Sequence, residues 1–129
     1  MLTTVHAFSG FSVDDLAAAK TFYGGVLGLD VKEGGMGALQ VTLPGGHEVF
    51  VYPKENHELA TFTILNFVVT DIDAAVDELN AAGVTTKIYR DPDFNTDEKG
   101  IARGRAAGYG PDIAWFRDPA GNVLSVLSD

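Results

Sequence analysis

The chain has 129 residues, enough for one domain or for two small halves that share a core. Its net charge of −9 disfavours binding to nucleic acid or to an anionic membrane surface. It has no cysteine, which excludes disulfides and thiolate metal ligands. No apolar run could span a membrane and the N-terminus shows no export signal, so we expect a cytoplasmic protein.

Two stretches of the sequence repeat each other. FSVDDLAAA (11–19) and FVVTDIDAA (67–75) align at a constant separation of 56 residues, with five identities in nine positions. A generic strand followed by a helix would not require this agreement. The repeat therefore favours two copies of one folding unit within the chain.

The first copy reads as a strand followed by a helix. The strand is expected over Val5–Val13, with Phe11 on one face and Phe8 on the other. Asp14 or Asp15 supplies the helix N-cap, and apolar residues at helical spacing follow as far as Leu27. Gly28 suits the left-handed residue that ends a helix.

The first copy then continues as strands at Leu39–Leu43 and Glu48–Tyr52, joined by the turn PGGH. The connection GGMG (34–37) reads as flexible. A polar linker is expected at Pro53–Thr61.

The second copy follows the same pattern. Leu65, Phe67 and Val69 share a strand face, Asp71 caps the next helix and Gly83 ends it. The strands expected after this helix are Thr86–Arg90, Ile113–Arg117 and Val123–Leu127, with DPAGN turning between the last two. The turns PGGH and DPAGN also align, at a separation of 75 residues.

The sequence resembles the vicinal oxygen chelate superfamily, the glyoxalase, bleomycin-resistance and extradiol-dioxygenase group. The resemblance is carried by FSVDDLAAAKTFYGGVLGLDV and WFRDPAGNVLSVL. It implies an α+β fold with two tandem βαβββ modules, about 1–57 and 62–129, whose sheets curl around a shared cavity within a single domain, 1–129. It also implies that a homodimer is common. It does not specify one activity.

Metal-dependent members of that superfamily hold a divalent cation with His, Gln or Glu on the first and last strands of each module. The resemblance places these four positions at Phe8, Phe50, Ile64 and Ser125, three apolar side chains and one hydroxyl. We therefore expect no cofactor. An off-register divalent metal site at His6 and Glu48 is the alternative, although two candidates fall short of the three or four ligands that a tight site needs.

A cavity lined mainly by apolar residues with a few polar groups suits a small-molecule ligand. The expected lining residues from the strands are Phe8, Gly10, Ser12, Phe50, Ile64, Asn66, Val68, Trp115 and Ser125, with Tyr109 as further aromatic wall. The alternative is a core filled by the same side chains. We expect binding of a small, partly aromatic or anionic molecule.

The segment Asp91–Pro111 is long for an ordered loop and concentrates basic residues: Lys99, Arg103 and Arg105. One hypothesis is a lid that delivers Arg103 or Arg105 to an anionic group on the ligand. The alternative is an exposed insertion whose basic side chains pair with nearby carboxylates at positions 93, 97 and 98.

Two classes of function remain. The first is a metal-free binding protein that resembles the bleomycin-resistance proteins. The second is an enzyme, a glyoxalase-type lyase or isomerase or a dioxygenase, with an atypical metal site or none. The sequence identifies no catalytic residue and no substrate.

Overall fold

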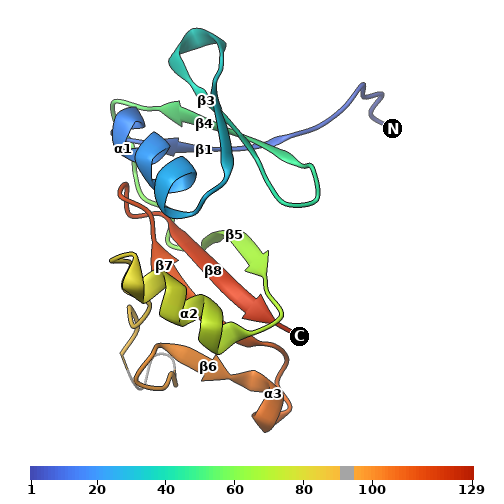
Figure 1. Ribbon diagram of the computed structural model, residues 1–129. Helices are drawn as coiled ribbons and strands as arrows, with labels where there is room; N and C mark the ends of the chain where they lie inside the picture. The colour runs from blue at the N-terminus through green and yellow to red at the C-terminus, as the bar shows by residue number, and fades with distance from the viewer. Residues whose placement is uncertain (91–94) are drawn as a thin grey trace. The chain divides into compact units, whose positions relative to one another are not determined.

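The computed structural model describes residues 1–90 and 95–129 (Figure 1). The chain divides into two compact units, Met1–Leu59 and Ala60–Asp129. Each unit is a four-stranded sheet with a helix against one face. No described helix has the length and apolar character needed to cross a membrane.

The first unit is a βαβββ module. Its sheet has the order β1-β4-β3-β2, with β1 parallel to β4 and the other pairs antiparallel. The elements are β1 (Ser9–Val13), α1 (Leu16–Lys20), the π-helical η1 (Thr21–Val26), β2 (Asp30–Glu33), the 3-10 turn η2 (Gly35–Gly37), β3 (Leu39–Thr42) and β4 (Glu48–Pro53).

The helical segment of this unit begins and ends where the sequence predicts. Asp15 is the N-cap, and its carboxylate accepts a hydrogen bond from the Ala18 amide at 3.1 Å. Gly28 follows the helix with φ of +70°. Tyr23 of η1 is fully buried and its ring centroid lies 5.6 Å from that of Phe11. Because strand side chains alternate, Gly10 and Ser12 belong to the opposite face of the sheet.

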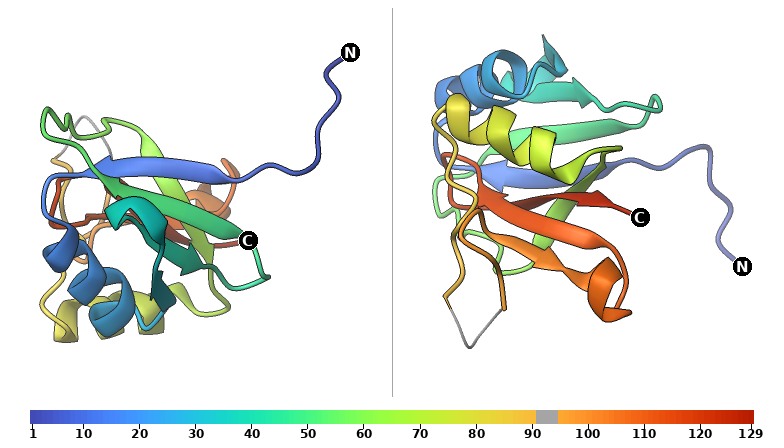
Figure 2. Two further views of the ribbon diagram at one scale, coloured as in Figure 1. Left: turned by 90° about the horizontal axis from the view of Figure 1, so that it is seen from above. Right: turned by 60° about the horizontal axis from the view of Figure 1, so that its bottom comes forward.

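The second unit repeats this topology. Its sheet has the order β5-β8-β7-β6, with β5 parallel to β8. The α2 helix crosses β7 and β8 on one face, as Figure 2 shows. The elements are β5 (Thr63–Val68), α2 (Ile72–Ala81), β6 (Ile101–Arg103), α3 (Gly104–Ala107), β7 (Asp112–Arg117) and β8 (Val123–Ser128).

The cap of α2 also matches the prediction. Asp71 accepts a hydrogen bond from the Ala74 amide at 3.1 Å, and Gly83 follows the helix with φ of +88°. Ile72 and Val76 are buried against the sheet, whose facing residues include Phe116, itself 0% exposed. This apolar face contributes most of the stability of so short a helix.

The strand pairings confirm the duplication and the predicted α+β class. In the first unit Gly10 pairs with Phe50, which pairs with Gln40 on β3. In the second unit Asn66 pairs with Ser125, which pairs with Trp115 on β7. Each member of the first row corresponds to one member of the second by the two separations, 56 and 75, found in the sequence.

Several predicted strands were wrong. The first strand begins at Ser9 rather than at Val5, and Thr86–Arg90 forms no strand although its β-branched residues predicted one. The edge position beside β7 belongs instead to β6, which the sequence analysis assigned to a loop. Thr86 satisfies its hydroxyl differently, at 2.6 Å from the Lys99 carbonyl oxygen. The edge strand β2 was also missed, because DVKE contains one apolar residue.

Candidate functional site

The face of the first sheet opposite its helix carries a row of aromatic rings. Phe50 of β4 lies between two others, with ring centroids 6.2 Å from Phe8 and 5.7 Å from Tyr52. His6 extends the row, 5.7 Å from Phe8. Phe8 is 64% exposed and Phe50 is half-buried, so the row presents ring surface at the face of the sheet.

Gly10 and Ser12 of β1 lie beside this row. A Cβ added at Gly10 would lie 3.1 Å from the Phe50 carbonyl oxygen and 3.9 Å from the Tyr52 ring, so any side chain there would press on the rings. Ser12 Oγ lies 2.7 Å from Nδ1 of His57, in the segment that follows β4. The pair supplies the polar edge of an otherwise aromatic face.

The four positions that the resemblance assigns to metal ligands hold Phe8, Phe50, Ile64 and Ser125, as described. Among the described residues, no group of three His, Asp or Glu side chains gathers closely enough to hold a metal ion. Extending the β1–β4 register places Phe8 opposite Glu48. His6 and Glu48 therefore offer at most two donors, and the expectation of a metal-free protein stays a prediction.

The corresponding face of the second sheet combines polar and aromatic groups. Ser125 is fully buried, and its Oγ lies 2.5 Å from Oδ1 of Asn66 on the neighbouring strand. On the other side of Ser125 is Trp115, whose ring contacts that of Tyr89 edge-on at 5.3 Å. Ile64 lies at an irregularity of the β5–β8 register, between Thr63 and Leu65.

The basic residues of the 91–111 segment are tied to carboxylates of their own unit; its residues 91–94 lie outside the described residues. Arg103 of β6 donates two hydrogen bonds to Asp73 of α2, at 2.8 and 3.0 Å, and approaches Asp97 at 3.2 Å. Lys99 lies 3.0 Å from Asp77. Arg105 and Tyr109 are exposed. This arrangement is the ion-pair alternative for Arg103, extended to a helix that the sequence analysis did not include.

These ion pairs predict a pH dependence of stability. The hydrogen bonds from Arg103 lower the pKa of Asp73 below its ordinary 3.8, and the charge of Lys99 acts in the same direction. A lowered pKa stabilises the fold above pH 3.8, and the contribution is lost as the pH falls through the folded value. The melting temperatures of the wild type and Asp73→Asn should therefore differ at pH 7 and converge near pH 3.

Salt and a matched variant separate this effect from a general loss of charge. The difference at pH 7 should shrink in 1 M NaCl, since both partners are exposed. Asp30→Asn serves as the control, because Asp30 is exposed in β2 and makes no ion pair within the described residues. A difference for Asp73→Asn that persists unchanged at pH 3 would contradict the prediction.

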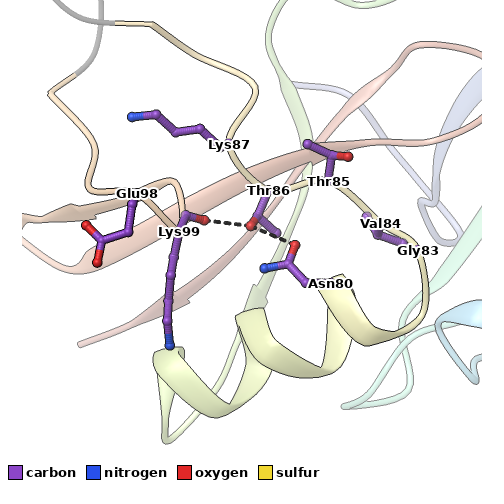
Figure 3. Close-up of a pocket in the computed structure, with 8 residues that line it drawn as sticks. All are labelled: Asn80, Gly83, Val84, Thr85, Thr86, Lys87, Glu98 and Lys99. Atoms are coloured by element: carbon purple, nitrogen blue, oxygen red, sulfur yellow. Dashed lines mark hydrogen bonds between the residues drawn. The ribbon is translucent and has the colours of Figure 1, made fainter.

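A surface hollow of about 300 Å³ lies at the C-terminal end of α2 (Figure 3). Its lining residues are Asn80, Gly83, Val84, Thr85, Thr86, Lys87, Glu98 and Lys99. Thr86 Oγ1 lies 3.1 Å from Asn80 Oδ1, and the Lys87 ammonium lies 2.9 Å from the Thr96 carbonyl oxygen. The polar groups of the hollow bind one another, so its chemistry is that of a stabilised connection.

The sequence analysis missed three residues of the sheet faces. Tyr52 follows Phe50 at the two-residue spacing that keeps both on one face, a signal that was available. His57 lies in a polar linker and Tyr89 in a segment that forms no strand. Their partners, Ser12 and Trp115, come from distant parts of the chain, and no spacing rule predicts those contacts.

Two βαβββ units with side chains presented on the free sheet faces define a class of small proteins built by internal duplication. A sequence profile of the Glyoxalase/Bleomycin resistance protein/Dioxygenase superfamily matches residues 4–126, and the chain belongs to this superfamily. No curated protein sequence matches the chain.

Solved structures confirm the fold. One similar structure is a genomically encoded fosfomycin resistance protein, FosX, from Listeria monocytogenes, with a TM-score of 0.69 and 12% identity over 99% of this chain and 95% of that chain. Another is a lactoylglutathione lyase from Agrobacterium tumefaciens, with a TM-score of 0.63 and 19% identity over 97% and 94%. A superfamily member from Sphaerobacter thermophilus gives a TM-score of 0.65 and 20% identity over 97% and 98%. These identities support a shared fold and no shared activity.

Proposed function

We propose that this protein binds a small, partly aromatic molecule on a sheet face and that it does so without a resident metal. One observation carries the proposal. Positions where metal-dependent relatives would need imidazole or carboxylate donors are occupied by Phe8 and Phe50, which join Tyr52 in a row of exposed ring surface. Aromatic rings bind planar ligands by stacking and edge contacts, with no requirement for a cation.

A thermal-shift screen of aromatic compounds on chelator-treated protein tests this function. A ligand at 100 times its Kd should stabilise the protein by about 2.7 kcal/mol and raise the melting temperature. Phe50→Ala should reduce the shift, whereas Phe62→Ala, an exposed ring that precedes β5, should not. Elemental analysis should find no stoichiometric Zn, Ni, Mn or Fe. Metal at one ion per chain, lost in His6→Ala or Glu48→Ala, would contradict the metal-free proposal.

A metal-free enzyme, a lyase or an isomerase, is the second candidate, and the Ser12–His57 contact favours it. An imidazole held at 2.7 Å from a hydroxyl can accept a proton during a reaction. Turnover of an aromatic substrate by chelated protein, lost in Ser12→Ala and in His57→Gln but retained in Ser9→Ala, would support this candidate over simple binding.

We also propose a homodimer. In the first sheet β1 is an edge strand, hydrogen-bonded to β4 alone. The residues before it extend away from the sheet, as both views of Figure 2 show, and include Leu2 and Val5, which are 85% and 105% exposed. An exposed strand edge with apolar residues is a pairing surface.

Sedimentation velocity at micromolar concentration should therefore show a dimer, and Val5→Asp should shift the population toward monomer. Lys54→Asp, an exposed change beyond the end of β4, is the control and should leave the dimer intact. A wild-type protein that sediments only as a monomer would contradict the proposal.

A further inference from the structure

The orientation of one amide group defines what the second sheet face can recognise. Ser125 is 0% exposed, and its hydroxyl lies 2.5 Å from Asn66 Oδ1. The hydroxyl carries the proton, so Ser125 donates and the Asn66 carbonyl oxygen accepts. The amide is thereby held with its oxygen toward β8. Its Nδ2 group, with two N–H donors, makes no hydrogen bond within residues 1–90 and 95–129.

Burial separates the roles of the two residues. Asn66 is exposed, so a ligand on this face can reach its amide. Ser125 is enclosed and cannot meet a ligand without displacement of its neighbours. Asn66 is thus the contacting group, and Ser125 is a positioning residue that acts through it.

Trp115 supplies the aromatic surface for the same ligand. It is paired with Ser125 on the strand beyond, so Trp115 and Asn66 lie two strands apart, about 10 Å between their backbones. The Tyr89 ring contacts the indole edge-on and restricts its movement. A ligand that stacks on Trp115 and also reaches the amide must carry its polar atom at the far end of an extended ring system.

We propose that Asn66 selects the ligand of this protein, as a donor to a carbonyl or carboxylate oxygen at one end of a bicyclic or similarly long aromatic molecule. The proposal rests on the proposed function and adds the chemical class of the ligand. It follows from an amide whose oxygen is already engaged, beside an aromatic surface at the distance of two strands.

Two matched probes test the donor. 2-Acetylnaphthalene and 2-ethylnaphthalene share a ring system and differ in one carbonyl oxygen, and equilibrium dialysis measures both. The wild type should bind the acetyl compound about tenfold more tightly, the effect of one hydrogen bond. Asn66→Asp keeps the shape and still accepts the Ser125 proton, but it presents a carboxylate to the carbonyl. The preference should disappear or reverse in this variant.

Two further variants complete the design. Ser125→Ala frees the amide to rotate, and it should reduce the preference for the acetyl compound while leaving the affinity for the ethyl compound unchanged. Asn80→Asp, a change of the same kind on α2, should leave the preference at the wild-type value. Melting temperatures show whether each variant is folded.

The outcomes distinguish this inference from the proposed function. Equal affinity of the wild type for both probes, or an unchanged preference in Asn66→Asp, would overturn the role of Asn66 and leave aromatic binding standing. Failure of the wild type to bind either probe would overturn both.

Discussion

Gly100→Ala is expected to lower the free energy of unfolding by about 3–5 kcal/mol, among the largest effects of any single methyl group in this chain. A Cβ at this position would lie 2.1 Å from the Thr86 carbonyl oxygen and 2.6 Å from its carbonyl carbon. The residue also has φ of +88°, where L side chains are strained. The backbone that would have to move is held by the bond from Thr86 Oγ1 to the Lys99 carbonyl oxygen.

Gly108→Ala provides the matched control. Gly108 follows α3 with φ of +75°, but an added Cβ there would meet no atom within 4 Å. Its cost should be about 1 kcal/mol, from the left-handed backbone alone. Chemical denaturation of both variants isolates the steric part, and equal costs would contradict the close approach of Gly100 to Thr86.

Asp118→Ala should destabilise the protein by about 2–4 kcal/mol, because it removes the acceptors of a buried turn. Asp118 and Asn122 are 4% and 2% exposed. The Asp118 carboxylate accepts hydrogen bonds from the Asn122 backbone amide at 2.8 Å and from its side-chain amide at 3.1 Å. Asn122 Oδ1 in turn accepts from the Ala60 amide at 3.0 Å, so the turn also orders the entry to β5.

Asp112→Ala is the control at the other end of β7. Asp112 accepts one exposed bond, from the Arg105 amide at 3.0 Å. Its loss should cost less than about 1 kcal/mol. Urea denaturation compares the two, and a similar cost for both would show that burial of the Asp118 turn contributes little.

The parts of the fold that depend on local chemistry were predictable from the sequence. Asp71 caps its helix with a side chain three residues from the amide that it binds, and Gly28 and Gly83 end helices through their own backbone freedom. The strand at Thr86–Arg90 was not excluded by local chemistry. It is excluded because a three-residue strand elsewhere, β6, takes the place beside β7.

The candidate site was predictable at the level of strand faces and not of individual contacts. The alternation of β1 and β4 placed Gly10, Ser12 and Phe50 together. The partner of Ser12 is His57, 45 residues away, and the partner of Arg103 is Asp73, 30 residues away. Such contacts depend on how a helix and a connection pack after the sheet has formed, which periodicity does not encode.

The second module differs from the first in the length of one connection. Three residues join η1 to β2, whereas residues 82–100 join α2 to β6. Loop-closure entropy grows only with the logarithm of length, so this extension costs about 1.6 kcal/mol. Asp97 accepts hydrogen bonds from the amides of Lys99 and Ile101 at 3.0 and 2.9 Å, close to where the connection enters β6. A duplicated module can thus acquire a long excursion between two elements without altering the register of the strands that follow, provided that the returning end supplies its own anchors.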